Sequence, residues 1–121
     1  MIASYRDLLV WQRAMELVYK LAAKLPREEN YGLASQLQRA VVSIPSNIAE
    51  GHARESGKEY LRYLLIACGS MAELETQVLL CARLCLTSDN EIAPVLDCAN
   101  EIGKMIRGLQ HSLNEKLIKG D

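Results

Sequence analysis

A chain of 121 residues has the length of one domain, and half of its residues are apolar, enough for one continuous core. Its formal net charge is −1, whereas a dedicated nucleic-acid-binding domain usually carries a clear basic excess. No apolar run approaches the ~20 residues of a membrane-spanning helix, and the first residues lack the basic-then-apolar pattern of a secretory signal. We therefore expect one cytoplasmic domain over residues 1–121, with no membrane segment.

The first helix is predicted over residues 7–24. One apolar seam has spacings of three and four residues: Trp11, Ala14, Val18, Leu21 and Leu25. Pro26 closes this helix, because the residue before a proline is pushed out of helical geometry.

The second helix is predicted over residues 29–50. Its inward residues are Leu33, Leu37, Ala40, Val41, Ile44 and Ile48. Pro45 removes one backbone hydrogen bond within this pattern, so we expect it to kink the helix or to divide it into two pieces. Gly51 is the residue expected to cap the C-terminus.

Two further helices are predicted over residues 56–84 and 88–118. Each opens on a capping box, Ser56 with Glu59 and Ser88 with Glu91. The last helix carries a regular heptad seam: Ile92, Val95, Ala99, Ile102, Ile106, Leu109 and Leu113. Four helices with short connections predict an all-α fold, an antiparallel up-down-up-down four-helix bundle.

A carboxylate interrupts the apolar seam of the third helix. In heptad spacing, Glu75 follows Leu64, Cys68 and Met71 at a core position. A buried charge needs a partner or becomes neutral. We expect a polar network that fixes helix register, consisting of Ser43, Ser46, Asn47, Glu50 and Glu75. The alternatives are a functional pocket around Glu75, Asn47 and Glu50, or a Glu75 that escapes to solvent at an edge of the bundle.

Positive side chains gather where the second helix passes to the third. Arg54, Lys58 and Arg62 lie there, and Arg39 lies further back along the second helix. Such a cluster can follow a phosphate backbone, with an affinity that salt weakens, or it can be an ordinary solvated surface. Tyr60 and Tyr63 beside it can stack on bases or pack at a helix end.

Metal and catalytic sites are not indicated. The four cysteines form no Cys-x-x-Cys pair, and we expect them to be reduced and buried. Neither His52 nor His111 stands in the Glu-x-x-His pattern of carboxylate-bridged metal bundles. We therefore expect no cofactor, no metal, no small-molecule substrate and no enzymatic activity.

Several blocks of the sequence resemble one family. They are Tyr5 to Leu8, Val10 to Gln12, Ser43 to Gly51, and Glu73 to Gln77. The chain resembles the four-helix bundle proteins first noticed as reading frames in intervening sequences of bacterial 23S rRNA genes. It is also similar to the accessory variability proteins of diversity-generating retroelements, which associate with a reverse transcriptase and nucleic acid. The resemblance implies a ring-like homo-oligomer, a pentamer.

From the sequence we expect a non-enzymatic, homo-oligomeric helical scaffold that binds RNA or a nucleic-acid enzyme. The alternative is a structural or protein–protein interaction module with no role in nucleic-acid binding.

Overall fold

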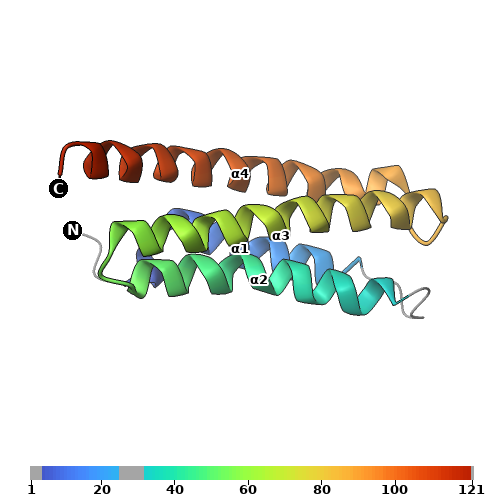
Figure 1. Cartoon of the computed structure of the whole chain (residues 1–121). Coiled ribbons are helices and arrows are strands. Elements are labelled where there is room, and N and C mark those ends of the chain that lie inside the picture. Colours follow the sequence, from blue (N-terminus) through green and yellow to red (C-terminus); the bar gives the residue numbers. More distant parts are fainter. Residues whose placement is uncertain (1–3, 25–31, 121) are drawn as a thin grey trace.

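The computed structural model describes residues 4–24 and 32–120, which form helices packed side by side (Figure 1). The short 3₁₀ helix η1 (Tyr5–Asp7) leads into α1 (Leu9–Ala22). Then follow α2 (Leu33–Ala53), α3 (Gly57–Arg83) and α4 (Asp89–Ile118). No strand occurs within the described ranges, so the predicted all-α fold is confirmed.

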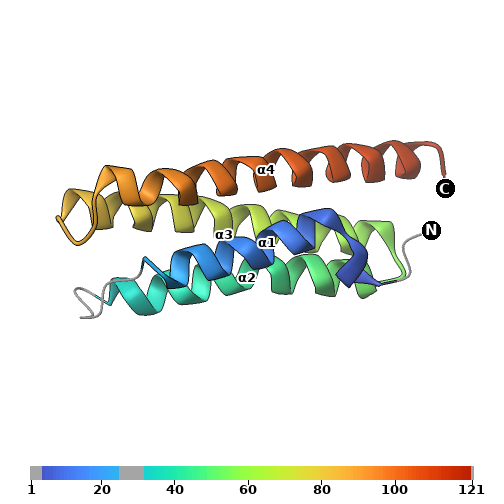
Figure 2. The same ribbon diagram turned by 180° about the vertical axis from the view of Figure 1, so that it is seen from behind.

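The helices form a closed ring of neighbours. In the described ranges, α2 packs against α1 and α3, and α4 packs against α3 and α1, whereas the diagonal pairs make no close backbone contact. Figures 1 and 2 show consecutive helices running in opposite directions, with α3 nearer the viewer in the first and α1 in the second. This is the packing of a four-helix bundle, and it places α1 and α3 on opposite sides of the core.

The seams predicted for the second and fourth helices are confirmed over most of their length. All six inward residues predicted for α2 are buried, as are those of α4 from Ile92 to Ile106. On α1 and α3 the predicted seams are wrong in part. Leu17 and Leu74 are fully buried, while Trp11, Val18 and Glu75 are only partly so. A strict seven-residue repeat drifts by ~20° per heptad around a straight helix, so heptad counting loses the buried face.

The helix ends follow the predicted capping boxes. Ser56 Oγ accepts from the Glu59 amide at 3.4 Å, and Ser88 Oγ accepts from the Glu91 amide at 3.2 Å. The predicted closure at Pro26 and the start of the second helix at residue 29 lie outside the described residues.

Pro45 lies inside α2 without ending it. The helix is continuous from Leu33 to Ala53, so the predicted division into two pieces is wrong, and the kink stays a prediction. One turn of the helix gains extra bonds here, because Asn47 Nδ2 donates to the Ser43 carbonyl oxygen at 2.8 Å. This bond reinforces the turn around Pro45 but does not replace the one that the proline lacks, which would reach the Val41 carbonyl.

Gly51 does not cap α2, contrary to prediction. The helix continues to Ala53, and the cap residue is Arg54, whose amide donates to the Gly51 carbonyl at 3.2 Å. Gly51 is instead a point of close approach. A Cβ atom there would lie 2.8 Å from Tyr63 Cβ and 3.0 Å from Tyr60 Cδ1. The missing side chain therefore lets α2 and α3 meet.

Candidate functional site

Two of the predicted cationic residues converge on one phenol at the turn between α2 and α3. The Arg54 guanidinium donates to Tyr63 Oη at 2.8 Å, and that of Arg62 donates to it at 3.5 Å. Their Cζ atoms lie 5.1 and 4.9 Å from the centre of the Tyr63 ring, within the range of cation–π attraction. The ring itself is buried. The turn thus holds two guanidinium groups against an aromatic side chain.

Carboxylates neutralise these arginines. Arg54 pairs with Glu50 at 3.1 Å, and Arg62 pairs with Glu59 at 3.0 Å. Charge interaction with Tyr63 and the hydrogen bond to Glu50 raise the pKa of Arg54. The hydrogen bond and charge of Glu59 raise the pKa of Arg62. Both arginines stay charged, but each already holds a negative partner, so the turn offers little net positive potential.

The other predicted binding residues do not extend this cluster into a continuous site. Lys58 is exposed on the first turn of α3, and Arg39 is exposed on α2 four turns before Arg54. Tyr60 is half-buried, its ring meeting that of His52 edge-on with 5.8 Å between centroids. Burial raises the pKa of its hydroxyl. Since Tyr60 and Tyr63 both pack on α2 near Gly51, neither is a free platform for stacking bases.

The predicted polar network exists in part, with a different partner on α3. Ser70 Oγ donates to Ser43 Oγ at 2.8 Å, and Asn47 Nδ2 donates to the same Ser43 oxygen at 2.9 Å. The chain of bonds ties α2 to α3 beside Pro45. Two turns further along, Gln77 Nε2 donates to Gln36 Oε1 at 3.3 Å. Partly buried polar links of this kind favour one register between two helices.

Glu75, Ser46 and Glu50 lie outside this network. Glu75 is half-exposed in a surface groove between α3 and α4, where Asn100 and Arg107 also lie. Its neighbour Leu74 takes the core position, so the expected contact with the Ser43 segment is wrong. Ser46 lies on the side of α2 that faces α1, and Glu50 pairs with Arg54.

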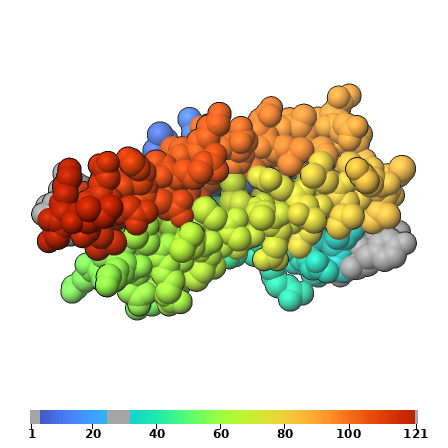
Figure 3. Space-filling view, turned by 45° about the horizontal axis from the view of Figure 1, so that its top comes forward, coloured from blue at the N-terminus to red at the C-terminus, as the bar shows by residue number. Residues whose placement is uncertain are grey.

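The sequence analysis missed an apolar surface on the outer side of α3. Leu65 is 63% exposed, Leu79 50% and Leu80 44%. The small residues Gly69 and Ala72 lie exposed between them. Figure 3 shows α3, in green to yellow, uncovered along its length between α4 and α2. The sequence feature that could have indicated this surface is the presence of Leu65, Leu79 and Leu80 outside the heptad seam of the third helix.

This surface makes α3 apolar on two sides. By length and composition alone α3 could cross a membrane, with a mean hydropathy of 1.4 over its most apolar window. Within the bundle, 44% of that window is buried. The core helix of a soluble protein passes the same test. The relevant point is that α3 is strongly apolar, although less than half of its most apolar window is buried in the bundle.

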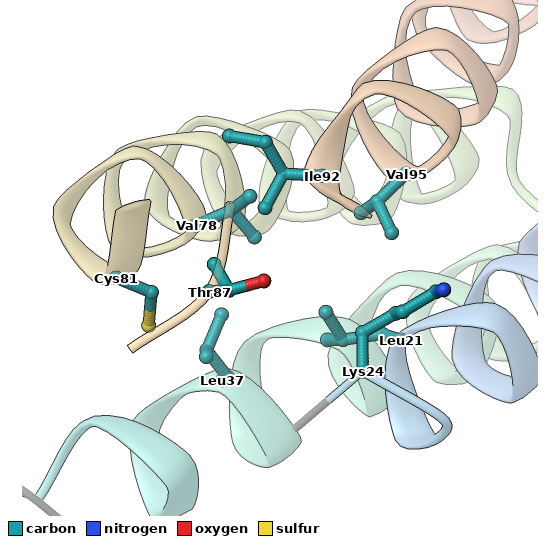
Figure 4. Close-up of a pocket in the computed structure, with 8 residues that line it drawn as sticks. All are labelled: Leu21, Lys24, Leu37, Val78, Cys81, Thr87, Ile92 and Val95. Carbon is teal, nitrogen blue, oxygen red and sulfur yellow. The ribbon is translucent and has the colours of Figure 1, made fainter. Parts of the chain in front are cut away.

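A small cavity opens at one end of the bundle and leaves no room for a substrate. It measures about 20 Å³, enough for one water molecule, and it is lined mainly by apolar side chains of the four helices, together with Lys24 and Thr87 (Figure 4). Drug-sized ligands need ~300 Å³ or more. Among the described residues, no three His, Cys, Asp or Glu side chains gather as metal ligands do.

The cysteines are free, and three of them are at least partly buried. Burial raises the pKa of Cys68, Cys81 and Cys98, which keeps these thiols protonated and poorly nucleophilic. Cys85 departs from the prediction, because it is exposed. It follows the end of α3 with φ of 60°, the left-handed conformation common at helix C-termini.

Comparison with known proteins agrees with this architecture. Residues 6–108 match the family described as 23S rRNA-intervening sequence protein. The chain belongs to this family. A search among curated proteins gave no match.

A solved structure with a similar fold covers most of the chain. It is the crystal structure of a protein of unknown function from the S23 ribosomal protein family of Bacteroides thetaiotaomicron VPI-5482. The TM-score is 0.77 at 22% sequence identity, over 84% of this chain and 98% of the other. At this identity the likeness establishes the fold alone, and neither description names a catalytic activity.

Proposed function

We propose that this chain is the protomer of a non-catalytic, homo-oligomeric helical scaffold. The observation that carries the proposal is the outer surface of α3, where Leu65, Leu79 and Leu80 are each between 44% and 63% exposed. Single exposed leucines are ordinary on protein surfaces, but several on the uncovered side of one helix favour an interaction surface. Gly69 and Ala72 between them leave space for close approach by another chain.

The chemistry of the described side chains supports a scaffold rather than an enzyme. The buried thiols have raised pKa values, and the cavity at the end of the core is too small for a substrate. The polar network of Ser43, Asn47 and Ser70 is only partly buried and links two helices, which suits a structural role.

Light scattering coupled to size-exclusion chromatography tests the assembly. We expect a mass several times 13.5 kDa, and five times if the pentameric ring implied by the family resemblance forms. A single 13.5 kDa species at micromolar concentration would refute the scaffold.

Binding of RNA or of a nucleic-acid enzyme is the second candidate. The exposed cations Arg54, Lys58 and Arg62 favour it, since they lie around one turn of the bundle. Their pairing with Glu50 and Glu59 weighs against it, because phosphates would compete with carboxylates already in place. The geometry therefore favours protein contacts over nucleic-acid contacts, and retention on structured RNA across a salt series decides between them.

A further inference from the structure

A small polar hollow lies between α3 and α4, the two helices that run side by side in Figure 3. It measures about 160 Å³, below the ~300 Å³ at which pockets for drug-sized ligands begin. The lining combines two opposite charges and one amide with small or apolar residues: Cys68, Met71, Ala72, Glu75, Ala99, Asn100, Gly103 and Arg107. A ligand of this hollow must therefore be small and must suit both charges.

Gly103 gives the Arg107 side chain room to lie in the hollow. Arg107 follows Gly103 by one turn of α4, and its Nη1 atom lies 3.4 Å from the point that a Cβ atom of residue 103 would occupy. Long side chains on a helix lean towards its N-terminus, which is the direction that Arg107 takes. A glycine inside a helix costs about 1 kcal/mol relative to alanine. At this position its missing side chain leaves space for the guanidinium group.

The Arg107 guanidinium has no carboxylate partner. It forms no ion pair within residues 4–24 and 32–120. Burial raises the pKa of the Cys68 thiol, and the charge of Arg107 opposes that rise, so the guanidinium lies near the sulfur. The planar guanidinium offers several N–H donors in a geometry that matches a carboxylate. Arg107 is thus free to bind an anion.

Glu75 faces the hollow from its opposite end. Met71 Cε lies 3.9 Å from the point where residue 103 would carry its Cβ atom, so Met71 and Gly103 are at the same level of the bundle. Because α3 and α4 run in opposite directions, the residues one turn after these two lie on opposite sides of that level (Figure 1). Those residues are Glu75 and Arg107, and each leans back towards the shared level. In the described part of the chain Glu75 also lacks an ion pair.

We infer that this hollow binds a small apolar α-amino acid as its zwitterion. The Arg107 guanidinium donates to the ligand carboxylate, and the ligand ammonium donates to Glu75 and to the Asn100 side-chain oxygen at the same end. A short apolar side chain then rests against Ala72 and Ala99. An anion without an ammonium group is repelled by Glu75, and a cation without a carboxylate is repelled by Arg107. Both helices belong to one chain, so the inference is independent of the proposed assembly.

Titration with L-valine, followed by NMR of the full chain labelled with ¹³C at the methionine methyl groups, tests the inference. The Met71 signal should shift and saturate, because that side chain lines the hollow. The signal of Met15, which lies in the groove between α1 and α2, should stay in place. Valine methyl ester lacks the carboxylate and N-acetylvaline lacks the ammonium group. Each should bind at least about tenfold more weakly than valine.

Two variants identify the groups that hold the ligand. Arg107→Gln and Glu75→Gln should each weaken valine binding by about tenfold or more, since each removes a charged partner. The matched controls are Lys104→Gln and Glu73→Gln, which make the same changes of charge at exposed positions outside the lining. Both controls should bind valine like the wild type. Circular dichroism will verify that all four variants fold.

The inference is wrong if valine causes no saturable shift of Met71. It is equally wrong if the ester and the N-acetyl derivative bind as well as valine, because apolar contact alone would then explain the shift. Binding by Arg107→Gln and Glu75→Gln at the level of their controls would place the ligand elsewhere and also overturn it. A monomeric wild type that binds valine as described would overturn the proposed scaffold and support this inference.

Discussion

At the scale of single residues, Gly51 is a position with no room for a larger side chain. The structure places its α-carbon where α2 meets Tyr60 and Tyr63, and an added Cβ would lie 3.3 Å even from the Tyr60 carbonyl oxygen. Alanine gains about 1 kcal/mol of helix propensity over glycine. That gain is opposed by overpacking, which typically costs about 1–3 kcal/mol.

We therefore expect Gly51→Ala to lower the free energy of unfolding by up to about 2 kcal/mol, because Tyr63 Cβ and the Tyr60 carbonyl oxygen are held by the α3 backbone and cannot move aside as the end of a flexible side chain can. Urea denaturation followed by circular dichroism measures it. Gly108→Ala is the matched control, since nothing lies within 4 Å of a Cβ there, and it should stabilise by about 0.5–1 kcal/mol. Equal effects of the two changes would mean that the α2–α3 contact is looser than described.

The buried thiols predict an alkaline loss of stability. Burial raises the pKa of Cys81 in the folded chain above its value of about 8.5 in an unfolded chain. Below that pH the thiol is neutral in both states, and above it the unfolded chain releases a proton that the folded chain retains. Stability therefore falls as pH rises from 8 towards 10.

Melting temperatures measured under reducing conditions at these pH values should show the decline. Cys81→Ala should melt lower than the wild type at pH 8 but lose less between pH 8 and 10. Cys85→Ala, at an exposed position, should decline as the wild type does. Parallel curves for all three proteins would show that other groups cause the alkaline loss.

At the scale of elements, the pairing of α2 with α3 depends on the Ser43–Asn47–Ser70 network. Ser70→Ala removes one hydrogen bond and Asn47→Ala removes two, all centred on Ser43. Each change should cost about 1–2 kcal/mol. Because they share a partner, the double variant should depart from the sum of the two by about 0.5 kcal/mol or more.

Glu75→Ala is the control for this cycle. Glu75 is half-exposed on the side of α3 that faces α4, so its loss should change stability by no more than about 0.5 kcal/mol. Thermal or chemical unfolding of the four variants beside the wild type provides the measurement. A large loss in Glu75→Ala would mean that Glu75 takes part in helix packing after all. Strict additivity in the double variant would mean that Ser43, Asn47 and Ser70 do not form one network.

Helix starts and buried faces could be predicted from the sequence to different degrees. Capping boxes placed the starts of α3 and α4 within one residue, because a cap is a local bond between Ser56 and Glu59 or between Ser88 and Glu91. The buried faces of α2 and α4 also followed from their apolar spacing. On α3, apolar residues occupy two sides, so Leu74 and Glu75 compete for one core position and spacing alone cannot decide between them.

The candidate site was harder to predict for a related reason. Arg54, Lys58 and Arg62 are close in sequence, and all three are exposed at or near the turn between α2 and α3. What the sequence could not show is that the two arginines converge on Tyr63, or that Gly51 is a contact rather than a cap. Those facts depend on how α2 and α3 pack, which is a tertiary property.

At the scale of the whole molecule, the balance of charge governs the choice between nucleic-acid and protein partners. The chain has a net charge of −1, and the two arginines at the turn between α2 and α3 are paired with Glu50 and Glu59. Affinity for phosphates depends on cations free to replace counterions, and it falls steeply with salt. The wild type should therefore leave a heparin column at low salt.

Removing the Glu50 and Glu59 charges should leave Arg54 and Arg62 free to bind phosphate or sulfate groups. We expect the variant Glu50→Gln with Glu59→Gln to leave heparin at clearly higher salt than the wild type, with an unchanged oligomeric mass. A matched pair of changes at exposed carboxylates away from the turn, Asp89→Asn and Asp97→Asn, alters net charge equally and should shift elution less. If the wild type instead binds structured RNA tightly, and loses it when Arg54, Lys58 and Arg62 become alanine, then the carboxylates orient the arginines for phosphate rather than screen them. In that case, nucleic-acid binding is the function that the turn serves.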